Sequence, residues 1–236
     1  MGFTEFLKDI SLIVASCTAI YGIGSWHREY KGKRQAELAE EVLSLFYEAR
    51  DAIKHIRNPF SHAGEGATRK QSENESADEK KAYDQAYVVF ERYNANLELF
   101  NRLHSLRYRF MTQFGEGSAK PFVELRKILN EIFASAQTLA NLWAKQRTFF
   151  RTDQASKEHF EFKEKLEAIF WEGLADEDPI NPKLEKCVQD IEVMCRGILS
   201  EKSIWKKIKE NPLYKMLKQK IANKANSADA KNRAAD

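Results

Sequence analysis

The sequence predicts an all-α protein, with one N-terminal transmembrane helix followed by a soluble antiparallel bundle of about four to five long helices. Three observations support this fold class: an uncharged apolar run near the start, apolar residues at helical spacing through most of the remaining chain, and few helix-breaking residues. The chain of 236 residues contains only 10 glycines and 5 prolines. Long uninterrupted helices are therefore allowed, and a turn-rich β-sandwich is disfavoured.

The predicted membrane span is residues 10–26, which read ISLIVASCTAIYGIGSW and carry no charged side chain. At ~1.5 Å per residue the run covers about 26 Å, near the lower limit for crossing a bilayer core. A buried core helix and a lipoprotein signal ending at Cys17 are the competing interpretations. The residues that follow are basic, namely Arg28, Lys31, Lys33 and Arg34. This bias predicts a single-pass protein of the plasma (inner) membrane, with residues 1–9 outside and the bulk of the chain in the cytoplasm.

Small residues recur on one face of this predicted span at steps of three and four. They are Ser11, Ala15, Thr18, Gly22 and Ser25. Small residues at this spacing let membrane helices approach closely. The face therefore predicts self-association, and a membrane effector that oligomerises through it is one hypothesis for function.

Residues 27–200 are expected to form the cytoplasmic bundle, because apolar residues recur there every three or four positions. The clearest stripe is Phe122, Leu125, Leu129, Ile132, Ala136, Leu139 and Trp143. Asn58-Pro59 and Gly115 are expected to end helices, whereas the polar loop 59–79 is expected to be flexible. The helices are expected at 38–56, 78–114, 118–143, about 153–173 and 184–198.

The C-terminal part is divided into a basic amphipathic terminal helix over 201–224 and a disordered tail over 225–236. Residues 201–224 contain eight lysines and two glutamates, together with apolar side chains such as Trp205, Leu213 and Met216. The helix is expected either to dock on the bundle or to lie on the cytoplasmic leaflet, where lysines are attracted to anionic lipid. Docking is the interpretation we favour, because Asn211-Pro212 interrupts the apolar side.

The composition excludes several classes of function. Basic and acidic residues nearly balance, 38 against 35, for a net charge of +3, whereas a dedicated nucleic-acid binder usually has a clear basic excess. The three cysteines, Cys17, Cys187 and Cys195, form no CxxC pair and no zinc-binding spacing with histidine, so they are expected to be reduced thiols. No cofactor-binding or metal-binding motif is present.

One short motif suggests catalysis. Residues 57–62 read RNPFSH and resemble the R-N-x-x-x-H signature of HEPN-domain ribonucleases, which are all-α proteins of toxin and defence systems. The resemblance implies that Arg57 would hold the scissile phosphate, Asn58 would orient it, and His62 would act as the general acid or base. Pro59 inside the motif departs from the family pattern. The alternative interpretation is a helix C-terminus with a solvent-exposed histidine.

The chain as a whole resembles a set of uncharacterised bacterial membrane proteins predicted to be single-pass. The resemblance rests on WHREYKGKRQAELAEEVLSLFYEARDAI directly after the apolar run and on LRYRFMTQFG at residues 106–115. It implies no activity. We therefore expect a non-enzymatic interaction module, with a lipid bilayer and a protein partner or a second copy as its partners. Nucleic acid is expected as a partner only under the ribonuclease alternative.

Overall fold

The computed structural model describes the backbone of residues 3–62, 64–145 and 152–200, together with residues 211, 212, 214 and 216. Side chains are described from residue 21 onward within these ranges, except that of residue 23. These residues form six α-helices, one short 3₁₀ helix and connecting loops, and they contain no strand. The predicted all-α class is therefore confirmed for this part of the chain.

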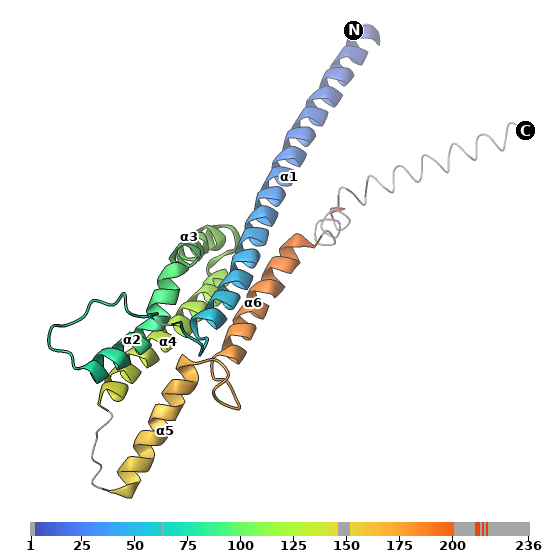
Figure 1. The fold of residues 1–236 in the computed structure, drawn as a ribbon. Coiled ribbons are helices and arrows are strands. Elements are labelled where there is room, and N and C mark those ends of the chain that lie inside the picture. The colour runs from blue at the N-terminus through green and yellow to red at the C-terminus, as the bar shows by residue number, and fades with distance from the viewer. Residues whose placement is uncertain are drawn as a thin grey trace, which may run out of the picture.

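In chain order the elements are α1 (Phe3–Ile56), α2 (Ala77–Ala95), α3 (Leu97–Phe114), η1 (Glu116–Ala119), α4 (Lys120–Ala144), α5 (Asp153–Phe170) and α6 (Asn181–Leu199). In Figure 1, α1 and α4 run in one direction and α2, α5 and α6 run in the opposite direction, whereas α3 continues from the end of α2 and bends away from it. The helix α1 is much the longest, at 54 residues, and its N-terminal half extends beyond the other helices (Figure 1).

The hydrophobic core is built on the C-terminal half of α1 and on α4. Burial on α1 begins at Leu38 and recurs through Ile56, which is the stripe expected from the spacing. All seven residues of the predicted stripe from Phe122 to Trp143 are buried on α4. Aromatic side chains connect the helices, since the Phe122 ring lies edge-on to Phe46 of α1 at 5.0 Å between centroids.

The segment 78–114, expected as one helix, is two helices that meet at Asn96. The Asn96 backbone leaves the helical region, with φ −107° and ψ 16°, and its side-chain amide donates to the carbonyl of Arg92. An asparagine side chain competes with the helical hydrogen bonds of the backbone in this way. The break redirects α3 so that Phe100, Leu103, Leu106 and Phe110 are buried. The bundle therefore has one helix more than the sequence predicted.

The predicted membrane span is largely outside the fully described residues. The backbone of α1 is a continuous helix from residue 3, but the side chains of residues 3–20, including Ser11, Ala15 and Thr18, are outside the described part. Gly22 and Ser25 are exposed. In the part that was searched, no helix is both long and apolar enough to cross a membrane. Apart from residues 211, 212, 214 and 216, the predicted segments 201–224 and 225–236 also lie outside the described residues.

Candidate functional site

Arg57, the first residue of the predicted catalytic motif, lies just after the end of α1 with its side chain fully buried. Its guanidinium donates to the carbonyls of Ala168, Ile169 and Trp171, at the C-terminal end of α5, over 2.8–3.2 Å. These are carbonyls that a helix leaves without partners at its C-terminal end. Arg57 therefore supplies hydrogen-bond donors to the last carbonyls of α5.

The same guanidinium forms a two-pronged ion pair with Asp178. Its Nη1 and Nη2 atoms lie 3.0 and 2.9 Å from the two carboxylate oxygens, and Nη1 also donates to the side-chain oxygen of Asn181. Asp178 in turn accepts hydrogen bonds from the amides of Ile180 and Asn181, at the start of α6. This one network joins the ends of α1, α5 and α6.

The pKa of Asp178 reflects opposing contributions. Burial acts to raise it, but the hydrogen bonds from Arg57 and from the amides of Asn181 and Ile180 outweigh burial, and the pKa is lowered. The carboxylate therefore stays charged at neutral pH. A lowered pKa means that the ion pair stabilises the fold above the ordinary pKa of aspartate, and that this stabilisation is lost as the pH falls through the folded-state value.

The geometry does not favour the ribonuclease interpretation of residues 57–62. The Arg57 donors point into the bundle and are occupied by protein acceptors, so none faces solvent where a phosphate could approach. Asn58 accepts a hydrogen bond from the amide of Phe60, which is a local turn. His62 is exposed in the loop that follows, and its amide donates to Glu65. Arg57 has a structural role here.

A second buried arginine, Arg92 of α2, holds the C-terminal end of α1. It donates to the carbonyls of His55, Ile56, Asn58 and Phe60, and it pairs with both carboxylate oxygens of Glu65. The hydrogen bonds from Arg92 lower the pKa of Glu65, although burial opposes them. Sequence reasoning missed this residue. The available signal was its position four residues after Val88, on the buried face of α2.

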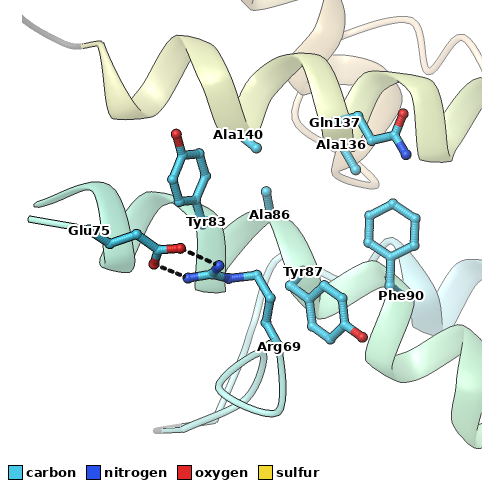
Figure 2. Close-up of a pocket in the computed structure, with 9 residues that line it drawn as sticks. All are labelled: Arg69, Glu75, Tyr83, Ala86, Tyr87, Phe90, Ala136, Gln137 and Ala140. Carbon is cyan, nitrogen blue, oxygen red and sulfur yellow. Dashed lines mark hydrogen bonds and ion pairs between the residues drawn. The ribbon is translucent and has the colours of Figure 1, made fainter. Parts of the chain in front are cut away.

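The sequence predicted a flexible loop over 59–79, whereas in the structure the loop that connects α1 to α2 is 57–76 and α2 begins at Ala77. The ion pair of Arg69 with Asp84 attaches this loop to α2. Arg69 also pairs with Glu75 within the loop (Figure 2). Arg69 donates to both carboxylate oxygens of Glu75 and to Asp84, and its guanidinium lies over the Tyr83 ring, 5.2 Å from the centroid. The hydrogen bonds from Arg69 lower the pKa of Glu75 to about 2. Glu75 is therefore charged at neutral pH and holds the Arg69 guanidinium within the loop.

A shallow pocket of about 270 Å³ lies between this attachment and the α2–α4 interface. Figure 2 shows alanine side chains and the rings of Tyr83, Tyr87 and Phe90 around it. The two charged residues at its edge, Arg69 and Glu75, are bonded to each other. The lining thus contributes apolar surface but no unpaired charged group. It offers no evident catalytic chemistry.

Two glycines in the 57–76 loop provide a matched test of its attachment. Gly64 and Gly66 have φ of +89° and +87°, but a Cβ on Gly64 would meet nothing within 4 Å, whereas one on Gly66 would lie 1.9 Å from the Asp84 carbonyl oxygen. Gly64→Ala is expected to cost about 1–2 kcal/mol of backbone strain. Gly66→Ala should cost about 3–4 kcal/mol, because the Gly66 amide also loses its hydrogen bond to Glu91 and the loop must move.

Urea unfolding of the two variants measures this difference, and hydrogen exchange at residues 64–69 locates it. Fast exchange is expected in Gly66→Ala and near-native exchange in Gly64→Ala. Equal losses of stability in the two variants would show that the loop is not attached to α2 as described.

The other groups that could carry chemistry lack reactive surroundings. Cys187 and Cys195 are buried free thiols, and burial raises their pKa to about 12 and about 11. A buried thiol with a raised pKa is a poor nucleophile. Within the described residues, no three or more His, Cys, Asp or Glu side chains are grouped so that they could hold a metal ion.

The fold and these networks define an all-α helical bundle whose helix ends are held by buried arginines. Comparison with protein-family models, with curated proteins and with solved structures finds no match to this chain.

Proposed function

We propose that the protein is a non-enzymatic, membrane-tethered interaction module. Residues 10–26 anchor α1 in the membrane, and residues 27–200 present the helical bundle on the cytoplasmic side to a protein partner or a second copy. The inner membrane is the proposed location. The ribonuclease alternative would need the Arg57 donors to be free for a phosphate, whereas protein acceptors occupy them.

The observation that carries this proposal is the uncovered part of α1. None of the described side chains from residue 21 to 37 is buried, and Tyr21 and Trp26 are 62% and 67% exposed. This stretch is about 25 Å of helix along which no described side chain is buried. Large aromatic residues followed by basic ones are typical of a helix at a membrane–water interface. The same residues on a helix in water would be left without a partner.

The opposite end of the bundle offers a contact for a protein partner. Phe60 is 84% exposed, yet its backbone is fixed, because its carbonyl accepts from Arg92 and its amide donates to Asn58. A large apolar side chain on a well-supported backbone is the kind of residue that dominates protein interfaces. This supports an interaction role for the part of the bundle at the C-terminal end of α1.

Alkaline carbonate extraction of cell membranes tests the anchor. The native protein is expected to stay in the pellet, whereas Val14→Lys/Ile20→Lys should move to the supernatant, because each charge near the centre of a membrane helix costs about 2.5–3.5 kcal/mol. Val193→Lys is the matched control, since Val193 is exposed on α6, and it should stay in the pellet. Native protein that remains in the supernatant without detergent, as a monomer, would refute the anchor.

A further inference from the structure

The charged side chains that follow the proposed anchor are divided between two faces of α1, which is helical throughout this stretch. Glu29, Lys33 and Glu37 recur at steps of four and therefore share one face. Lys33 lies between the two carboxylates along the helix, and its ammonium is 3.9 Å from the carboxylate of Glu37. The two acids outnumber the base, so this face is slightly acidic and has no cation to spare for another partner.

The other face of the same stretch is purely basic. Arg28, Lys31 and Arg34 recur at steps of three, which spreads them over about a third of the helix circumference. All three side chains are exposed, and no carboxylate among the described residues forms an ion pair with them. Glu29 is the only acidic residue between positions 21 and 36, and it lies on the opposite side of the helix. This basic face therefore needs an anionic partner from outside the bundle.

Two aromatic rings lie along one edge of the basic face. Trp26 and Tyr30 stack with their centroids 5.9 Å apart, and the Arg34 guanidinium lies 5.8 Å from the Tyr30 centroid. The two rings are 67% and 50% exposed. Amphipathic rings of this kind are stable at the boundary between lipid headgroups and acyl chains. The face thus combines unpaired cations with the side chains that a bilayer surface accommodates.

An anionic bilayer surface fits both parts of this face. Arg28 and Arg34 lie about 3 Å and about 12 Å beyond Trp26 along the helix axis. The headgroup layer adds about 5–8 Å on each side of the hydrocarbon core, and charges act over a further Debye length of about 8 Å at physiological salt. All three cations are therefore within electrostatic reach of the headgroups. A second copy of the protein fits this face less well, because it would bring like charges together.

We propose that Arg28, Lys31 and Arg34 bind the headgroups of anionic phospholipids, so that the protein gathers acidic lipid on one face of α1. This inference rests on the proposed anchor, which brings the face to the bilayer, but it adds a requirement of its own. An apolar span inserts whatever the headgroup charge, whereas the basic face prefers anionic lipid and loses that preference when salt screens the charges. The guanidinium groups can also hold a lipid phosphate through two parallel hydrogen bonds.

A contact-quenched probe on the basic face measures this preference in the full-length protein. His27 is exposed and lies one turn before Lys31 on the same face. His27→Cys on a Cys17→Ser background carries a bimane dye, because Cys187 and Cys195 are buried and burial raises their thiol pKa. The protein is reconstituted in phosphatidylcholine vesicles that contain a small fraction of nitroxide-labelled phosphatidylserine or, in a parallel sample, of nitroxide-labelled phosphatidylcholine. The labelled phosphatidylserine is expected to quench the dye more strongly.

Two single substitutions on opposite faces of α1 form a matched pair. Lys31→Gln should lower the ratio of quenching by the two labelled lipids by up to about fivefold, which is the contribution of one cation near anionic lipid. Lys33→Gln removes the same charge from the acidic face and should leave the ratio nearly unchanged. The preference should disappear in Arg28→Gln/Lys31→Gln/Arg34→Gln, and also in 1 M salt, where the Debye length falls to about 3 Å. Equal losses in Lys31→Gln and Lys33→Gln, or equal quenching by the two lipids in the protein without these substitutions, would overturn the proposal.

Flotation of the same samples distinguishes failure of the basic face from failure of the anchor. Protein that floats with pure phosphatidylcholine vesicles, but is quenched equally by the two labelled lipids, retains the anchor and refutes the basic face. Protein that floats only with vesicles containing phosphatidylserine, and loses this in the triple glutamine variant, refutes the anchor and supports the basic face. Protein that floats with neither kind of vesicle refutes both.

Discussion

Arg57→Ala is expected to lower the free energy of unfolding by about 3–5 kcal/mol, because it breaks a buried ion pair from one side. The variant leaves the Asp178 carboxylate without its guanidinium, and it leaves the carbonyls at the end of α5 without donors. Arg57→Lys should recover only part of the loss, since a single ammonium cannot reach the six acceptors that the planar guanidinium reaches. Urea unfolding of the full chain, followed by circular dichroism in one detergent, measures both changes.

Arg102→Ala is the matched control for this experiment. Arg102 also pairs with a carboxylate, Glu41, at 2.7 Å, but its side chain is exposed on α3. An exposed ion pair is worth about 1 kcal/mol or less. If Arg57→Ala and Arg102→Ala lose similar stability, the Arg57 network does not hold the helix ends together, and a functional role for residues 57–62 would regain support.

Arg92→Ala is expected to lower the free energy of unfolding by a similar amount, about 3–5 kcal/mol, and to destabilise one region before the rest. It removes the donors for the last carbonyls of α1 and for Phe60, and it leaves Glu65 without its partner. The end of α1 and the start of the 57–76 loop should therefore open before the rest of the bundle. Hydrogen exchange at residues 55–66 measures this local opening, and urea unfolding measures the total loss.

The Arg92–Glu65 pair also predicts a pH dependence. The pKa of Glu65 is lowered in the fold from its ordinary value near 4.5. The stabilisation is therefore complete above that value and is lost as the pH falls through the folded-state pKa. Acid should lower the protection factors of the amides at residues 55–66, which compare the exchange rate with the intrinsic rate at the same pH, in the native protein but should lower them little in Arg92→Ala. An identical acid response in both would show that Glu65 is not the group that titrates.

The two arginines supply hydrogen-bond donors to the C-terminal ends of α1 and α5. A helix that stops in the interior must find donors for its last carbonyls. Arg92 supplies them to α1, and Arg57, one residue past the last turn of α1, supplies them to α5. The bundle thus has a rigid end that positions Phe60 and a free end from which α1 emerges.

The sequence alone determined the helical class and most helix positions. The stripe from Phe122 to Trp143 and the stripe that begins at Leu38 are local patterns, and burial follows from them directly. Pro121, Gly115 and Asn58-Pro59 set boundaries through their own backbone limits. These features depend on residues within a few positions of each other, so periodicity and propensity suffice to find them.

Tertiary structure alone decided the role of Arg57 and the attachment of the 57–76 loop. The partners of Arg57 lie more than 110 positions away in the chain, at Ile169 and Asp178. No local pattern encodes such a pairing, and a short motif looks the same whether its arginine faces solvent or the core. What separates the two is desolvation: a buried guanidinium is stable only where acceptors surround it, and that arrangement exists only in the folded bundle.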